Sequence, residues 1–397
     1  MPLNNTVSFN KCFNMTQFTP QSPQVSRIKV SMILRTGVCL PRRLLRNTPS
    51  TLYASNTRPR ATSSSTMRLL TLSALIPLIT AYPSPAPSAS KPLPLLIWHG
   101  LGDRYDADGL HSVGELAANI HPGTEVHYIR VSDDGSEDQR ATFFGNITAQ
   151  SEEICASLAA NENLTDSSGV VRADALGFSQ GGQFLRGLVE RCPALSVRSL
   201  VTFGSQHNGI AQFQRCGTWD LLCKGAVALV GSNAWTDYVQ SHVVPAEYYR
   251  EVNKTTGLPT DGYLEHSHFL ADINNERKEK KRVYAKRLAA LEKFVMFVFE
   301  DDKTVVPKES GWFAEVNETS GVVTDLRDRA IYLEDWIGLK ELDDKGGLVF
   351  ESVEGEHMAL KRKDLERTFK KYFGAERVVG ELGVDGRQQV LATKNDL

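Results

Sequence analysis

The chain has 397 residues, a formal net charge of -2 and a sequence pI near 6.5. This length allows two average domains or one large α/β domain with insertions, and the balanced charge gives no sign of a nucleic-acid-binding protein. Strand signals continue through the middle of the sequence without an intervening linker, so we expect a single large domain.

The first 66 residues are basic and lack acidic residues, the first of which is Asp103. This composition is typical of a mitochondrial transit peptide, but a second signal competes with that interpretation. Met67 and Arg68 precede an apolar run over 69–81 that ends in small residues, which is typical of a secretory signal peptide. So short a run does not comfortably span a bilayer, and we expect no transmembrane segment.

We therefore interpret Met67 as the physiological start, which makes the upstream leader an extension or a gene-model artefact outside the fold; a start at Met1 stays open. A Pro/Ser-rich linker follows the signal peptide. The expected segments are a leader (1–66), a signal peptide (67–81), a linker (82–92), a folded domain (93–374) with a cap over about 210–290, and a polar tail (375–397).

The folded domain begins with an apolar run over 93–98, typical of a buried parallel strand, which ends in the segment His99-Gly100-Leu101-Gly102. After an early strand, hydrolases of the α/β type use such a segment to supply one backbone N–H of the oxyanion hole, which would be that of Leu101. The alternative is a glycine turn with His99 packed beneath it. A helix over 112–120, a strand over 125–131 and a helix over 147–160 follow, and this alternation indicates a parallel sheet.

The next strand, over 170–176, leads into Gly177-Phe178-Ser179-Gln180-Gly181, a G-x-S-x-G box, and then into a helix with one apolar face. A serine at such a strand–turn–helix junction has a strained backbone that exposes its hydroxyl, and the glycines allow strand and helix to pass closely. The box predicts a nucleophile at Ser179, with the backbone N–H of Gln180 as the second oxyanion donor. The alternative is a glycine-rich connector with a surface serine.

A strand over 197–203 precedes the cap, where the regular pattern is lost. The apolar run over 226–230 in this insertion either lines a groove for a hydrophobic substrate or only packs the cap. The run over 276–287 mixes acidic and basic residues, which favours a solvated helix face over a membrane-surface patch.

Two later strands carry the remaining candidates. The strand predicted over 293–299 runs into Asp301 and Asp302, and the strand over 347–353 is followed by His357. Serine, acid and histidine thus occur in the order typical of α/β hydrolases, each beyond the carboxyl end of a strand. The histidine would take the serine proton while the acid fixes its tautomer. Of nine histidines, only His357 follows the last strand, and spacing favours Asp302 over Asp301.

Four of the six cysteines lie in the folded part, which permits two disulfides in three possible pairings: Cys155, Cys192, Cys216 and Cys223. Buried free thiols are the alternative, and the absence of a C-x-x-C motif argues against a zinc or thioredoxin-like site. Candidate glycosylation triplets agree with secretion and begin at Asn146, Asn163, Asn253 and Asn317.

Five segments of the chain together resemble the lysosomal palmitoyl-protein thioesterase 1 family, over roughly residues 93 to 373. They are Leu-Leu-Ile-Trp-His-Gly-Leu-Gly-Asp (95–103), Gly-Phe-Ser-Gln-Gly-Gly-Gln-Phe-Leu-Arg (177–186), Gln-Arg-Cys (214–216), Phe-Leu-Ala-Asp-Ile-Asn-Asn-Glu-Arg (269–277) and Glu-Gly-Glu-His-Met (354–358). The resemblance implies an α/β-hydrolase fold, with a mostly parallel central sheet flanked by helices and a cap between the strands near 203 and 293.

The resemblance also assigns roles to individual residues. It matches the family's nucleophile to Ser179 and its histidine to His357, and the alignment of the acidic segment selects Asp302, while a later acid of the family is replaced by Val306. It implies disulfides Cys155–Cys192 and Cys216–Cys223. An adjacent cysteine pair that the family can carry is missing here, where Arg104 and Tyr105 stand.

The resemblance implies a thioesterase that removes long fatty acyl groups from cysteines, with S-acylated proteins or peptides and long-chain acyl thioesters as its substrates. A lipase or carboxylesterase acting on oxygen esters is the alternative among enzymes, and a catalytically silent acyl-binding protein on a hydrolase fold is the alternative from another class. We expect a monomer in the lysosome, the vacuole or outside the cell, with no metal or other cofactor.

Overall fold

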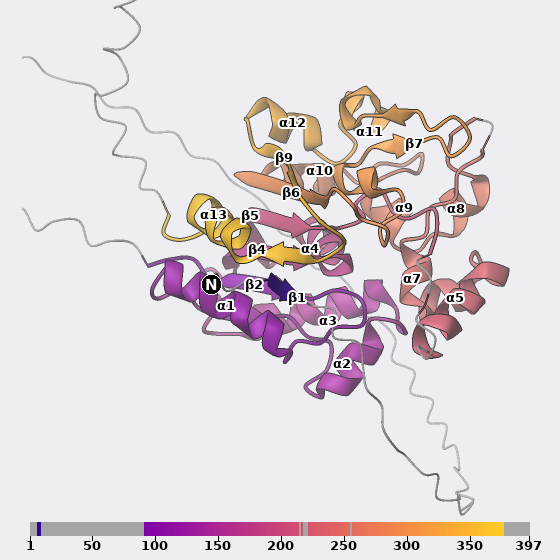
Figure 1. Cartoon of the computed structure of the whole chain (residues 1–397). Coiled ribbons are helices and arrows are strands. Elements are labelled where there is room, and N and C mark those ends of the chain that lie inside the picture. The colour runs from indigo at the N-terminus through magenta and orange to yellow at the C-terminus, as the bar shows by residue number, and fades with distance from the viewer. Residues whose placement is uncertain (1–5, 9–90, 214–215, 217–220, 255, 377–397) are drawn as a thin grey trace, which may run out of the picture. The chain divides into compact units, whose positions relative to one another are not determined.

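The computed structural model describes residues 6–8, 91–213, 216, 221–254 and 256–376 (Figure 1). All of them belong to one compact unit. The expected signal peptide and nearly all of the expected leader, linker and tail lie outside the described residues. Within the part of the chain that is described, no helix combines the length and the apolar character needed to cross a membrane.

Six parallel strands form the central sheet of this unit, in the spatial order β3-β2-β4-β5-β6-β9. The inner strands β4 and β6 are buried along nearly their whole length, and the continuous apolar run of β6 predicts this. Because all strands run the same way, their carboxyl ends share one edge of the sheet. The strands are Val126–Tyr128 (β3), Leu95–Trp98 (β2), Val171–Phe178 (β4), Leu195–Phe203 (β5), Lys293–Phe299 (β6) and Leu348–Val353 (β9).

Helices cover both faces of the sheet (Figure 1). On one face, α1 (Asp108–Ile120) packs beside α13 (Arg362–Tyr372), which buries Leu365 and Phe369 at the i, i+4 spacing of an amphipathic helix. Four helices pack against the opposite face of the sheet, and their side chains form a second apolar core cluster with the strands. These helices are α3 (Ile147–Ala160), α4 (Gln180–Arg191), α10 (Arg282–Ala289) and α12 (Leu339–Asp344).

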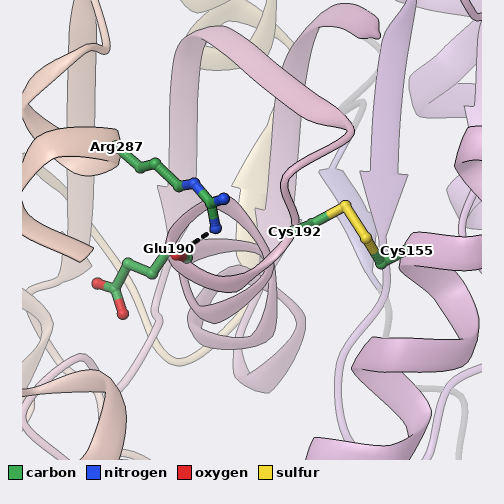
Figure 2. Close-up of a disulfide and its surroundings, with 4 residues drawn as sticks. All are labelled: Cys155, Glu190, Cys192 and Arg287. Carbon is green, nitrogen blue, oxygen red and sulfur yellow. Dashed lines mark hydrogen bonds between the residues drawn. A yellow bond between two sulfur atoms is a disulfide. The ribbon is translucent and has the colours of Figure 1, made fainter. Parts of the chain in front are cut away.

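The helix α4, which follows Ser179, is tied to a neighbour on each side, as Figure 2 shows. Cys155 of α3 and Cys192 at the C-terminal end of α4 form a disulfide. On the other side, the Arg287 guanidinium of α10 donates a hydrogen bond of 3.0 Å to the backbone carbonyl of Glu190. The second disulfide joins Cys216 and Cys223, so the structure contains both pairings that the resemblance implies.

The cap between β5 and β6 contains short helices, of which the first three share a small apolar cluster, whereas the last two contribute to the core cluster of the sheet. Ala226 and Val230, from the apolar run of the cap, are buried in this cluster, which favours packing of the cap over the lining of a groove. The helices are Leu221–Asn233 (α5), Asp237–His242 (α6), Val244–Glu247 (α7), Asp261–His266 (α8) and Leu270–Ile273 (α9).

The charged run over 276–287 is only partly a solvated helix face. The helix α10 begins at Arg282 and leaves Arg282 and Lys286 exposed. The expectation is wrong for Glu276, whose side chain is 3% exposed and accepts a hydrogen bond of 3.2 Å from Arg250 Nε. Burial of this carboxylate depends on an arginine 26 residues away in sequence, so local composition did not indicate it.

Several short elements were not predicted. The edge strand β10 (Ala359–Lys361) pairs antiparallel with β1 (Thr6–Ser8), which belongs to the leader that we expected outside the fold. An edge strand offers unpaired backbone groups to any extended segment, so this pairing needs no sequence signature. The individual helices of the cap and α12 were not predicted either, nor were α2 (Gly135–Ala141), η1 (Lys308–Trp312), β7 (Glu315–Val316), β8 (Val323–Thr324), η2 (Leu326–Asp328) and α11 (Ala330–Leu333).

Candidate active site

The structure brings together the three residues predicted as a triad. Ser179, Asp302 and His357 follow β4, β6 and β9, whose carboxyl ends lie at one edge of the sheet. His357 Nε2 lies 3.0 Å from Ser179 Oγ, and His357 Nδ1 lies 2.7 Å from Asp302 Oδ2. Both distances are hydrogen bonds, so the imidazole connects the hydroxyl to the carboxylate in the geometry of a nucleophile, base and orienting acid.

The backbone at Ser179 has the strain expected of a nucleophile elbow. Its φ of 51° and ψ of -126° lie in a region that non-glycine residues rarely adopt. The flanking glycines are required by close contacts, because a Cβ on Gly177 would lie 2.2 Å from Gly182 Cα, and a Cβ on Gly181 would lie 2.2 Å from the His99 carbonyl oxygen. The turn therefore holds Ser179 between the end of β4 and the start of α4.

The two candidate acids differ in burial and contacts. The Asp302 side chain is 1% exposed, and its Oδ1 accepts hydrogen bonds from the backbone N–H groups of Thr304 (2.8 Å) and Val305 (3.0 Å). These bonds leave Oδ2 directed at His357. Asp301 is exposed to solvent. The geometry therefore favours Asp302 as the acid.

The segment expected to supply an oxyanion donor lies beside Ser179. A Cβ built on Gly100 would lie 3.8 Å from Ser179 Oγ. The N–H of Gln180 opens α4 and thus has no intrahelical acceptor. Among the described residues, neither this N–H nor that of Leu101 donates to a protein acceptor. Both donors are therefore free to bind an oxyanion formed at Ser179.

Two other histidines, His99 and His207, are buried, and neither contacts Ser179 as His357 does. His99 is 2% exposed and its Nε2 donates a hydrogen bond of 2.8 Å to Asp138. His207 is completely buried, and burial together with the charge of Arg186 lowers its pKa well below the usual value. These observations agree with His99 packed beneath the glycine turn, while the turn still lies beside Ser179.

Asp138, the buried partner of His99, was not predicted as a site residue, because the helix α2 that carries it was not predicted. A signal was present: Asp134 and Glu137 have the spacing of a helix N-cap followed by an acidic residue. In the structure the Asp134 side chain accepts hydrogen bonds from the backbone N–H groups of Ser136 and Glu137 and begins the helix.

An open groove of about 510 Å³ lies between α2 and α6. Phe144 and Tyr238 provide its aromatic lining, and Glu137, Arg140 and His242 also line it. Ala141 also lines it and directly precedes Thr142, whose carbonyl accepts a hydrogen bond of 3.3 Å from Gln180 Nε2. One residue of the groove lining is therefore next in sequence to a residue that contacts Gln180.

The four glycosylation candidates differ in exposure. Asn163 and Asn253 are exposed, whereas Asn146 and Asn317 are partly buried. The Asn146 side chain caps α3 by accepting a hydrogen bond of 2.9 Å from the Ala149 N–H. Asn163 and Asn253 are thus the more accessible acceptors.

The sequence of the chain matches a known family over most of the described domain. The family model for palmitoyl protein thioesterase matches residues 94–357. The chain belongs to this family. The matched range contains Ser179, Asp302 and His357. Curated relatives with thioesterase names are similar over 291 and 289 residues of the chain.

Two of these family members show how far the similarity extends. A palmitoyl-protein thioesterase-dolichyl pyrophosphate phosphatase fusion from Schizosaccharomyces pombe is 36% identical over 73% of this chain, which spans 45% of the fusion. Palmitoyl-protein thioesterase 1 from Caenorhabditis elegans is 32% identical over 72% of this chain and 93% of its own length. Among solved structures, one from work on the metagenome-derived lipolytic enzymes LipS and LipT has 13% identity and a TM-score of 0.37, covering 72% of this chain and 95% of that one.

Proposed function

We propose that the chain is a palmitoyl-protein thioesterase, which hydrolyses long-chain acyl thioesters on cysteines of lipidated proteins. The observation that carries the proposal is the hydrogen-bonded series Ser179–His357–Asp302 in a member of this family. Hydroxyl, imidazole and carboxylate in this arrangement are the groups that acyl transfer requires. The names of the two curated relatives support a thioester as the bond that is cleaved.

In the proposed mechanism, Ser179 Oγ attacks the thioester carbonyl carbon while His357 Nε2 takes the hydroxyl proton. The backbone N–H groups of Leu101 and Gln180 bind the oxyanion that develops on the carbonyl oxygen. The carbon–sulfur bond then breaks, the cysteine sulfur leaves with the proton from His357, and the acyl group remains on Ser179. Water activated by His357 releases the fatty acid and restores the serine. Asp302 holds the imidazole in the required tautomer throughout.

We place the acyl chain in the groove between α2 and α6, whose aromatic lining suits an alkyl chain. We also propose that the domain enters the secretory pathway and acts in the lysosome, the vacuole or outside the cell. The two disulfides support this route, because such bonds persist in oxidising compartments.

The test compares a palmitoyl thioester with its matched oxygen ester, using the purified chain and its Ser179→Ala variant. We expect faster thioester turnover by the unmodified chain and a loss on the order of 10⁵-fold in the variant. Activity retained in Ser179→Ala would exclude the assignment of the nucleophile. Faster cleavage of the ester would favour a lipase or carboxylesterase, and failure of a fluorophosphonate probe to label Ser179 would favour a silent acyl-binding protein.

A further inference from the structure

The turn that bears the Leu101 N–H is bonded to α2 at several points. The turn is closed by a hydrogen bond of 3.3 Å from the Asp103 N–H to the Gly100 carbonyl, with Gly102 at a φ of 77°. The Gly102 N–H donates to Thr142 Oγ1 (2.9 Å), and its carbonyl accepts from Gln139 Nε2. Both polar backbone groups of the residue after Leu101 are therefore held by α2 and its C-cap residue Thr142.

The two ends of the same segment are bonded to Asp138, a second residue of α2. The completely buried Asp138 carboxylate accepts hydrogen bonds from His99 Nε2 (2.8 Å), before the turn, and from the Tyr105 N–H (2.9 Å), after it. Its other oxygen accepts from the Val131 N–H at 2.7 Å. Burial opposes ionisation of Asp138, but the hydrogen bond and charge of His99, with the two backbone donors, lower its pKa. The acid is therefore an ionised, fully bonded anchor.

Thr142 also contacts the residue that carries the second oxyanion donor. Its carbonyl accepts a hydrogen bond of 3.3 Å from Gln180 Nε2, and its hydroxyl donates to the Gln139 carbonyl at 2.6 Å. Thr142 is 5% exposed and Gln180 is 2% exposed, so water does not compete freely for these bonds. One residue thus joins the turn that follows β2 to the residue that follows the serine.

We propose that Thr142 is a positioning residue for the oxyanion hole, because it fixes the separation between the Leu101 and Gln180 N–H groups. This inference rests on the proposed function, in which these two groups bind the oxyanion. An oxyanion hole is effective only when its donors are held at hydrogen-bond distance from the developing charge before the reaction begins. Loss of the Thr142 hydroxyl should therefore weaken binding of the transition state more than binding of the substrate.

The test uses the purified full chain with a palmitoyl thioester and with a palmityl trifluoromethyl ketone, whose adduct with the serine carries an oxyanion. In Thr142→Val a methyl group replaces the hydroxyl that accepts from Gly102. We expect kcat to fall on the order of tenfold to a hundredfold, with KM within about twofold and a similar loss of ketone affinity. Thr142→Ser, which keeps the hydroxyl, should restore most of kcat.

The matched control is Thr368→Val on α13, where a threonine that is 1% exposed donates to the Asp364 carbonyl. This variant should keep kcat and ketone affinity unchanged. The proposal is overturned if Thr142→Val keeps the kcat of the control, or if Thr142→Ser loses as much as Thr142→Val.

If Thr142→Val does not fold, Gln139→Met provides a second test, because it removes the donor to the Gly102 carbonyl at a partly exposed position. It should lower kcat several-fold with little change in KM, and an unchanged kcat overturns the proposal. If the unmodified chain does not cleave the thioester, the proposed function fails, whereas the loss of ketone affinity in Thr142→Val still tests the positioning role by itself.

Discussion

Asp301 and Asp302 are adjacent in sequence, but their surroundings are very different. Asp302 is buried, bonded to two backbone N–H groups and directed at His357, whereas Asp301 is exposed. An acid in the position of Asp302 keeps the imidazole in the tautomer that can accept the serine proton, and it stabilises the imidazolium that forms. The two aspartates therefore offer a direct comparison between a bonded acid and its nearest neighbour.

Asp302→Asn should lower kcat on the order of 10³-fold to 10⁴-fold, because an amide stabilises the wrong histidine tautomer. Asp301→Asn is the matched control and should change kcat by less than about twofold, since exposed side chains away from the imidazole contribute little. Steady-state hydrolysis of a palmitoyl thioester measures both. Equal losses, or a larger loss at Asp301, would show that Asp302 is not the orienting acid.

At the scale of elements, the helix after the serine is cross-linked to its neighbour. The disulfide Cys155–Cys192 closes a loop with a sequence separation of 37 and joins α3 to the end of α4, whereas Cys216–Cys223 has a separation of only 7. A cross-link restricts the unfolded chain more when the loop is longer. The first bridge should therefore contribute more to the free energy of unfolding.

Replacing both Cys155 and Cys192 by alanine should lower the free energy of unfolding by about 4 kcal/mol, and the same change at Cys216 and Cys223 by about 2 kcal/mol. Urea denaturation of the two double variants measures the difference. A larger loss for the short loop would mean that local packing, rather than loop length, determines the effect.

The strands and the triad could be predicted because their signals are local. The strands β2 and β6 are nearly continuous apolar runs, and Ser179, Asp302 and His357 each follow a strand that is rich in apolar residues. The helix α2 has no apolar face, and Asp138 and Thr142 act through contacts with loops more than 30 residues away. Such contacts leave no periodic pattern in the sequence.

The burial of charged side chains could not be predicted from the sequence either, because it also depends on contacts between distant segments. Arg186 is completely buried in α4, where its guanidinium donates to Glu190 (2.9 Å) of the same helix and to Asn274 (2.7 Å) beside the cap helix α9. Its neighbours in sequence predict the helix correctly. Only the fold shows which acceptors compensate for the loss of water around the charge.

At the scale of the whole molecule, one buried acid links the cap to the sheet layers. Glu247 of α7 is completely buried, and its Oε1 accepts a hydrogen bond of 2.9 Å from the Ile147 N–H at the start of α3. Burial raises the pKa of Glu247 well above its usual value of 4.5, and the Ile147 hydrogen bond and the charge of Arg191 only partly compensate. The folded chain should therefore keep the Glu247 proton to a higher pH than the unfolded chain does.

This acid predicts how the free energy of unfolding changes with pH. Above pH 4.5 the unfolded chain loses the Glu247 proton while the folded chain keeps it, so folding is favoured at low pH. The stabilisation falls as the pH rises towards the folded-state pKa, by up to about 1.4 kcal/mol per pH unit. Glu247→Gln removes this dependence, so its stability relative to the unmodified chain should increase between about pH 5 and pH 7.

Urea denaturation across this range measures the effect, with the exposed Glu153→Gln on α3 as the control. The control should follow the unmodified chain at every pH. A difference between Glu247→Gln and the unmodified chain that stays constant with pH would show that the Glu247 carboxyl group is ionised in the folded chain.

Covalent attachment of the acyl group to Ser179 is the central claim of the proposed function. The most direct measurement is mass spectrometry of peptides from the chain after rapid acid quenching of its reaction with a palmitoyl thioester. We expect one palmitoyl group on the peptide that contains Ser179. The Ser179→Ala variant, in which Asp302 and His357 are unchanged, should carry no palmitoyl group on this peptide. Turnover with the palmitoyl group on another residue, or turnover without any trapped acyl-enzyme, would contradict the claim.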